Sequence, residues 1–168
     1  NGEHQLCEGK VEGSMAPTTK VLIHSQGDSE GSLKHAIDHY RPRAVVLISN
    51  PDSKASRILD WIKSKNENLL GREVRDVDHA HLIEIEAFEQ DSVLQMIKAV
   101  EKAKVWASSV LPKEEMEFFA GIAGGTKLIV VGMALAAIQG NLTSYYVLDP
   151  THASKNNGDY ILEVGFMN

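Results

Sequence analysis

A glycine pair followed by threonine and lysine, Gly124-Gly125-Thr126-Lys127, is the part of the sequence best suited to hold an anion. It lies between two apolar runs, which is the pattern of a buried strand, a tight turn and a helix. Glycine lets backbone N–H groups approach a ligand closely. The first N–H groups of a helix lack intrahelical partners and carry its positive dipole end, so they attract phosphate. We therefore predict a phosphate-binding turn with Lys127 as an added cation; an ordinary packed turn is the alternative.

Short apolar runs alternate with segments of helical periodicity along the rest of the chain. One segment carries strong end signals, with Asn50 as a helix cap and Pro51 at the first helical position. A short strand is also expected near 73–77. The main strands are expected at 21–23, 44–48, 82–86, 118–122, 143–148 and 160–166, and the helices at 33–40, 51–62, 91–111 and 126–139.

This alternation predicts an α/β fold, with a Rossmann-like, mostly parallel sheet and helices on both faces. The last strand is expected to run antiparallel to the fifth, after a hairpin turn at 156–159. Ligands of such sheets bind at the carboxyl ends of the strands. The polar loops 25–31, 49–52 and 123–127 each follow a strand. We expect these three loops to meet at one edge and form the binding site.

Composition restricts the classes of partner. The 168 residues are enough for one domain, 20–168, preceded by a polar arm or linker at 1–19. A net charge of −6 argues against binding to duplex nucleic acid. Cys7 is the single cysteine, so an internal disulfide is excluded and a reducing, cytoplasmic setting fits. The longest apolar run is shorter than the ~20 residues that span a bilayer. The sequence begins at Asn1 rather than Met, which leaves an upstream segment open.

From Lys20 to about Asp149 the sequence resembles the CARF domain, a CRISPR-associated Rossmann-like sensor. The late motif of that family is a strand, Thr-Gly-Gly-Thr-Lys, a helix of small apolar residues, and a strand with Tyr-Tyr-Val. The family often carries Asn-x-Thr before the glycines, where this chain has Gly121 and Ala123. The first strand and the loop that begins at Ser25 also match. The late motif reads here Ala123-Gly-Gly-Thr-Lys127, Met133-Ala-Leu-Ala-Ala137 and Tyr145-Tyr-Val147.

The resemblance implies a homodimer that binds one cyclic oligoadenylate, most often the tetra-adenylate, across its two-fold axis. No metal and no other cofactor is expected, and Asp28 and Asp52 are expected to cap helices. The expected ligand contacts come from the three loops: Ser25, Gln26, Gly27 and Ser29; Ser49 and Asn50; and Ala123, Gly124, Gly125, Thr126 and Lys127.

The resemblance also implies an attached effector. One arrangement in the family is a transmembrane helix joined to the sensor by a polar linker, as in the small membrane effectors of type III CRISPR systems. We therefore expect a cytoplasmic sensor in antiviral defence, tethered to the inner membrane by a segment upstream of this sequence. The main alternative is a ring nuclease that cleaves its ligand, with Lys127 and Ser25 as candidates. A nucleotide-dependent oxidoreductase is disfavoured because no Gly-x-Gly-x-x-Gly follows the first strand.

Other residues that could carry chemistry have simpler interpretations. His24 is expected to pack inside the fold, and Trp61 and Trp106 to pack in the core or a dimer contact rather than stack on a base. Two histidine pairs have the spacing of metal ligands but lack a third ligand nearby: His35 with His39, and His79 with His81.

Overall fold

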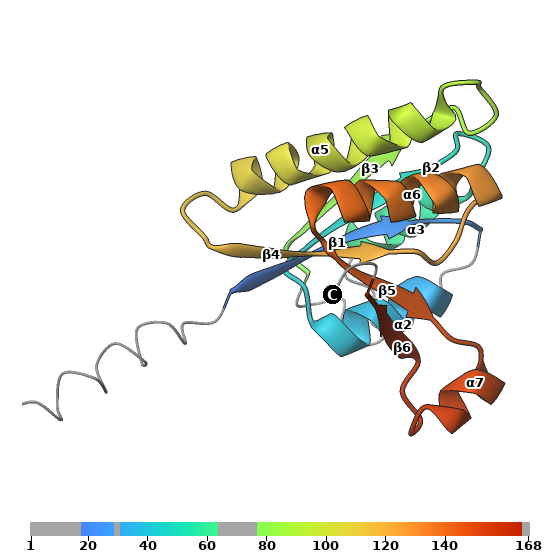
Figure 1. The fold of residues 1–168 in the computed structure, drawn as a ribbon. Coiled ribbons are helices and arrows are strands. Elements are labelled where there is room, and N and C mark those ends of the chain that lie inside the picture. Colours follow the sequence, from blue (N-terminus) through green and yellow to red (C-terminus); the bar gives the residue numbers. More distant parts are fainter. Residues whose placement is uncertain (1–17, 29–30, 64–76, 166–168) are drawn as a thin grey trace, which may run out of the picture.

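The computed structural model describes residues 18–28, 31–63 and 77–165, except for the side chain of Trp61. They form a six-stranded sheet in the order β3-β2-β1-β4-β5-β6 (Figure 1). The first five strands are parallel and β6 runs antiparallel to β5, so the predicted fold class is confirmed. The strands are β1 Thr19–Ser25, β2 Ala44–Ser49, β3 His79–Glu84, β4 Met116–Gly121, β5 Thr143–Val147 and β6 Ile161–Val164. The helices are α2 Gly31–Tyr40, α3 Ala55–Lys63, α5 Ser92–Val110, α6 Lys127–Gly140 and α7 Pro150–Lys155.

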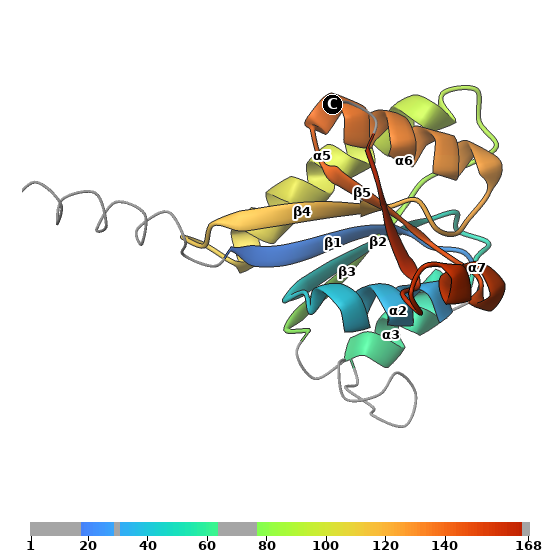
Figure 2. The same cartoon turned by 60° about the horizontal axis from the view of Figure 1, so that its bottom comes forward.

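Helices cover both faces of the sheet. Helices α2 and α3 lie on one face, and α5 and α6 lie on the other (Figure 2). Successive residues of β1 point to opposite faces, so Leu22 joins the core beneath α2 while Ile23 joins the core beneath α5 and α6. Because both faces are covered, β1 and β2 need apolar residues on both sides, which explains their continuous apolar runs.

The small residues of α6 pack against the sheet and against α5. Met133, Ala136 and Ala137 are buried there, as the sequence predicted for this helix. A Cβ on Gly132 would lie 2.6 Å from the Cβ of Met96 on α5, so the helices approach too closely for any larger residue. Asn141 ends α6 in the left-handed conformation, with φ of 53°.

Two predicted elements differ from the structure. Helix α3 begins at Ala55 and not at Pro51, because the backbone N–H of Ser53 donates to the carbonyl of Asn50 in a turn (3.0 Å). Lys54 precedes the helix and its carbonyl accepts the N–H of Ile58 (3.2 Å), so Asn50 is not the cap that was expected. The Oγ of Ser53 accepts the N–H of Ala55 (3.2 Å) and supports the first turn. Strand β3 is an edge strand, as expected, but spans His79–Glu84 rather than 82–86. The strand expected near 73–77 falls almost wholly outside the described residues.

Strands β5 and β6 are joined by a helix rather than by a simple hairpin turn. Asp149 caps α7 by accepting the N–H of His152 (2.8 Å), and Pro150 occupies the first turn. The predicted turn at 156–159 follows this helix and contains two residues with positive φ, Asn157 at 57° and Gly158 at 79°. The Asp-Pro pair is a helix-start signal that the sequence analysis overlooked.

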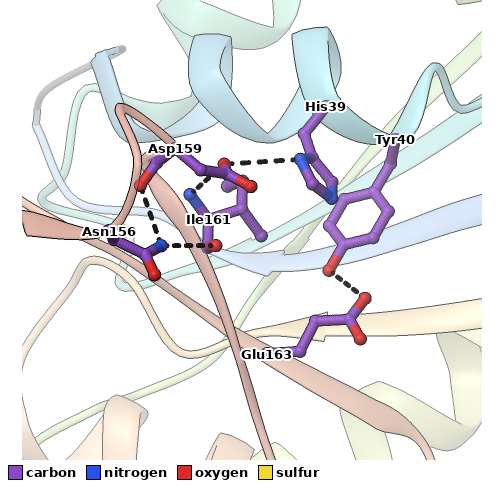
Figure 3. A network of polar contacts seen from close by, with 6 residues as sticks. All are labelled: His39, Tyr40, Asn156, Asp159, Ile161 and Glu163. Atoms are coloured by element: carbon purple, nitrogen blue, oxygen red, sulfur yellow. Dashed lines mark hydrogen bonds and ion pairs between the residues drawn. The ribbon is translucent and has the colours of Figure 1, made fainter. Parts of the chain in front are cut away.

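The β5–α7–β6 segment docks on α2 through a polar network (Figure 3). The hydroxyl of Tyr40 donates to Oε1 of Glu163 (2.9 Å), and burial together with this bond raises the pKa of Tyr40. Nδ1 of His39 lies 3.6 Å from Oδ1 of Asp159. The ring of His35 stacks on Tyr160, with centroids 3.8 Å apart. These contacts hold the short edge strand β6 against the rest of the domain.

In the part of the chain that the structure describes, no helix is both long and apolar enough to cross a membrane.

Candidate functional site

The three polar loops meet, as predicted, in a cavity of about 610 Å³ at the carboxyl ends of the strands. Strand order reverses at β1, with β2 and β3 on one side and β4 on the other, so the strand-end loops diverge there and leave a crevice. The first loop lines it with Gln26, Gly27 and Asp28, the second with Ser49, Asn50 and Asp52, and the third with Ala123, Gly124, Gly125 and Thr126. Ser29, also expected at the site, lies outside the described residues.

Ser25 joins two strand ends and is not among the cavity-lining residues. Its side chain is fully buried, and Oγ donates to the carbonyl of Gly121 (2.9 Å). The same oxygen accepts the N–H of Ala123 (3.1 Å), and the Ser25 carbonyl accepts the N–H of Gly124 (3.1 Å). These bonds hold the end of β1 to the end of β4 and set the position of the glycine turn.

Glycines allow the first and third loops to touch. A Cβ on Gly27 would lie 2.9 Å from the backbone N of Gly125, and one on Gly124 would lie 2.8 Å from the backbone N of Gly27. Gly125 has φ of 99°, a conformation that other residues rarely adopt. The glycines are therefore needed for the two loops to pack together, and they also allow a ligand to approach the backbone closely.

Helix α6 begins at the cavity, at the turn for which the sequence predicts anion binding. Thr126 is its N-cap, and its Oγ1 accepts the N–H of Ile129 (3.4 Å). Among the described residues, the N–H groups of Gly125, Thr126 and Lys127 have no hydrogen-bond partner. These groups and the helix dipole favour a negative charge at this point. Lys127 is exposed and lies outside the cavity lining, so its contact with a ligand remains a prediction.

The side chains of Asn50 and Ser49 form hydrogen bonds within the protein. Oδ1 of Asn50 accepts the N–H of Ala87 (3.2 Å), and its Nδ2 donates to Oδ2 of Asp52 (3.4 Å). The hydroxyl of Ser49 donates to the carbonyl of Asn50 (3.2 Å) and contacts Oγ of Ser53. The second loop is therefore fixed to the segment between β3 and α5.

The ionisable side chains that line the cavity are acidic. Asp28 and Asp52 are carboxylates, and the lining contains no lysine, arginine or histidine among the described residues. Asp28 accepts the N–H of Lys54 through Oδ1 (3.0 Å), just before α3, so it supports the start of α3. An anionic ligand would be held by backbone N–H groups at α6, while the carboxylates can accept hydrogen bonds from neutral hydroxyl or amino groups.

A buried histidine lies directly behind the cavity. Nδ1 of His24 lies 2.6 Å from the hydroxyl of Tyr145, and its Nε2 lies 3.3 Å from Oγ of Ser32, which lines the cavity. Burial lowers the pKa of His24 to about 3 and raises that of Tyr145, so both side chains are neutral. His24 therefore packs inside the fold, as predicted.

The His24–Tyr145 pair leaves no room for a side chain at position 121. A Cβ on Gly121 would lie 2.5 Å from the Tyr145 hydroxyl and 2.6 Å from Nδ1 of His24. An asparagine side chain at this position would occupy the space that the pair fills. A buried imidazole–phenol contact therefore fills the space beside Gly121, ahead of the glycine turn.

Sequence reasoning missed one prominent cavity residue, Phe88, whose side chain is 77% exposed. It follows the third strand, which ends at the same sheet edge as the three predicted loops. An aromatic residue in the loop that follows a strand of a parallel sheet is the signal that could have identified it. Ser32, Ser53 and Ile129 complete the lining.

The described residues contain no group of three or more His, Cys, Asp and Glu side chains that could hold a metal ion. The ring of His81 stacks on Trp106, with centroids 5.1 Å apart, and Trp106 packs against the core, as expected for that residue.

No family model matches the sequence, and neither does any curated protein. Many solved structures share the fold, and three of them are described next. Csm6 from Enterococcus italicus, bound to cyclic hexa-2'-fluoro-hexa-dAMP, aligns over 89% of this chain with a TM-score of 0.61 and 14% identity. Can2 from Sulfobacillus thermosulfidooxidans, in complex with cyclic tetra-adenylate, aligns over 77% with a TM-score of 0.53 and 11% identity. A type III CRISPR defence DNA nuclease activated by cyclic oligoadenylate aligns over 80% with a TM-score of 0.53 and 19% identity.

The aligned region is only part of each of these larger chains. It covers 43% of the Csm6 chain, 32% of the Can2 chain and 19% of the nuclease chain. At these identities the likeness shows the fold, and the fold is the one that the sequence resemblance implied.

Proposed function

We propose that this chain is a CARF-type sensor that binds a cyclic oligoadenylate, with cyclic tetra-adenylate as the preferred ring. The observation that carries the proposal is the convergence of three strand-end loops on one cavity at the N-terminus of α6. Support comes from the shared fold, because Csm6 and Can2 were solved with cyclic adenylate ligands.

The cavity suits the chemistry of a nucleotide. A phosphate fits the unpartnered N–H groups of Gly125 and Thr126 and the dipole of α6. Asp28 and Asp52 can accept hydrogen bonds from a ribose hydroxyl or an adenine amino group. The acidic lining disfavours a ligand that is anionic over its whole surface, and favours one whose phosphates lie at one side of the cavity.

A homodimer would place two such cavities around one ring. The outer face of α6 carries an apolar stripe whose side chains are between 40% and 49% exposed: Leu128, Val131, Leu135 and Ile138. Their spacing of three, four and three residues is that of a helix–helix seam. Because α6 also begins at the cavity, packing of two α6 helices about a two-fold axis would bring the two cavities close together.

We further propose that ligand binding is relayed to an effector, with an upstream membrane segment as the expected partner and the sensor on the cytoplasmic side. The ligand can act only if it binds two dimer arrangements with different affinity. In membranes that carry the full-length protein, added ligand should change permeability; unchanged permeability would remove the membrane effector from the proposal.

We favour a sensor over a ring nuclease as the function of this chain. Ser25, one of the two residues considered for a ring nuclease, is buried and uses its hydroxyl in two hydrogen bonds. Lys127, the other, lies outside the cavity lining. Prolonged incubation of the pure chain with cyclic tetra-adenylate should leave the ring intact, and linear products on chromatography would show a nuclease instead.

The decisive test is calorimetric titration of the pure chain with cyclic tri-, tetra- and hexa-adenylate. The expected result is one tetra-adenylate ring bound per two chains. If none of the three rings binds, the function is wrong and only the fold assignment stands.

A further inference from the structure

Phe88 is the most exposed large apolar side chain among the described residues, at 77%, and it lines the cavity. Its neighbour Ala87 is fully buried and fills the core beneath the loop, so Phe88 does not contribute to that packing. An exposed aromatic ring at the edge of a binding cavity is typical of a ligand contact.

The loop that carries Phe88 is held firmly. The N–H of Ile85 donates to the carbonyl of Ser49 (2.9 Å), and the N–H of Glu86 donates to Oε1 of Gln95 on α5 (3.0 Å). The N–H of Ala87 donates to Oδ1 of Asn50 (3.2 Å). Three successive backbone groups are thus fixed by β2, its loop and α5, so the exposed ring is presented from a set position.

Phe88 lies at the opposite side of the cavity from the predicted phosphate site. It follows β3, while Thr126 follows β4, and β2 and β1 lie between these strands. Three strand spacings separate the two strand ends by about 14 Å. A nucleotide also has two different ends, with its phosphate at one end and its base at the other. It can therefore extend across the cavity from the start of α6 toward Phe88.

We propose that Phe88 is a base-stacking residue that receives one purine of the ligand on its ring while the phosphates lie toward the start of α6. This inference rests on the proposed function and names which part of the cavity recognises the base. Asn50 is then a positioning residue, which acts by holding the Phe88 loop through Ala87 instead of reading an adenine edge itself.

The test compares Phe88→Ala with wild type in calorimetric titrations with cyclic tetra-adenylate at several salt concentrations. Each base–aromatic contact is worth about 5- to 150-fold in affinity, and the proposed homodimer loses one such contact from each chain, so binding of the ring should weaken by at least that range. The slope of log affinity against log salt should stay unchanged, because no charge is removed. Phe88→Trp should retain affinity and add a tryptophan signal that the ligand quenches, in excess of any change in wild type.

Val105→Ala is the matched control, because Val105 is also strongly exposed, at 70%, but lies in the second half of α5, away from the cavity. It should bind as wild type does. Thermal unfolding of Phe88→Ala should match that of wild type. If that variant does not fold, the titration is made with Phe88→Leu, which keeps the apolar bulk but lacks the aromatic face and should also bind more weakly than wild type.

Asn50→Ala tests the positioning role in a double-mutant cycle. It should weaken binding on its own and cause little further loss in the Phe88→Ala background. If wild type binds the ring and Phe88→Ala binds it with the same affinity, the stacking inference is wrong and the sensor function still stands. If wild type itself binds none of the rings, the inference and the proposed function fail together.

Discussion

At the scale of single residues, Gly121 shows how a buried contact sets the identity of a neighbouring position. The His24–Tyr145 pair occupies the space that any side chain at 121 would need. Both partners are fully buried and neutral, so this contact is made without water. Its other end reaches the cavity through Ser32, so the same residues support the fold and the site.

Replacing Gly121 with alanine should lower the free energy of unfolding by about 1–3 kcal/mol, the usual cost of overpacking a core. The added Cβ would lie 2.6 Å or less from atoms of both buried partners. Chemical denaturation measures this change. Gly140→Ala is the control, since its Cβ would make only an ordinary contact of 3.5 Å with Leu142. Equal stability of Gly121→Ala and wild type would contradict the packing argument.

The buried, neutral His24 makes stability depend on pH. Its folded-state pKa of about 3 lies below the ordinary value of 6.5, so the unfolded chain binds a proton that the folded chain does not. Stability from this group is present above about pH 6.5 and falls as the pH is lowered toward 3, by up to about 1.4 kcal/mol per pH unit.

Denaturation of wild type and His24→Asn between pH 7 and pH 4 measures this contribution. Wild type should lose more stability on acidification than the variant, whose amide has no proton to gain. Parallel losses in the two proteins would show that His24 is not the group responsible.

At the scale of elements, α6 has apolar residues on nearly every side. One face packs on the sheet and α5, while its outer stripe at 128, 131, 135 and 138 is half-exposed. A helix that is apolar all round is usually buried. The proposed α6–α6 contact would cover this stripe, and it would link the dimer to the cavity, because the same helix begins there.

Val131→Asp should abolish the proposed dimer, because it places a charge in the centre of the seam at a side chain now 49% exposed. Light scattering after size-exclusion chromatography should give the dimer mass for wild type and the monomer mass for this variant. Val105→Asp, on α5, is the matched control and should stay dimeric. A dimeric Val131→Asp would mean that another surface forms the contact.

At the scale of the whole molecule, the charge distribution opposes a highly anionic ligand. The chain carries a net charge of −6, and Asp28 and Asp52 line the cavity. Binding of the proposed cyclic oligoadenylate would therefore depend on local features, which are the dipole of α6, its unpartnered N–H groups and Lys127. Lys127 is exposed at the first residue of α6 and must reach over the cavity to touch a phosphate.

Lys127→Ala should weaken ligand binding and flatten its salt dependence by about one unit of slope per lost phosphate contact. Titrations at three or more salt concentrations measure both quantities. Lys102→Ala, an exposed lysine on α5, should leave the slope as in wild type. An unchanged slope in Lys127→Ala would assign anion binding to the backbone groups alone.

The sequence by itself determined the architecture and predicted where the strand-end loops would meet. Local signals were sufficient for this: apolar runs for buried strands, helical periodicity, and glycine-rich loops after strands. Because parallel strands end at one edge of a sheet, those signals also predicted that the three loops would meet, which the cavity confirms. Local signals were misleading at the start of α3, where the Asn50-Pro51 pair lies in a turn before the helix. At α7 a local signal, Asp149-Pro150, was present but no helix was predicted from it.

Only the tertiary structure decided what individual residues do at the site. The partners of the Ser25 hydroxyl lie 96 and 98 residues away, and Tyr145, the partner of Nδ1 of His24, lies 121 residues away. Asn50 likewise binds a backbone group 37 residues along the chain. Residue type and spacing do not identify such distant partners, and the position of Phe88 after a strand did not by itself reveal that its side chain is exposed. A polar side chain that forms its hydrogen bonds within the protein stabilises the loops of the site, whereas one that faces the cavity can contact a ligand. Only the folded structure distinguishes these two kinds of residue.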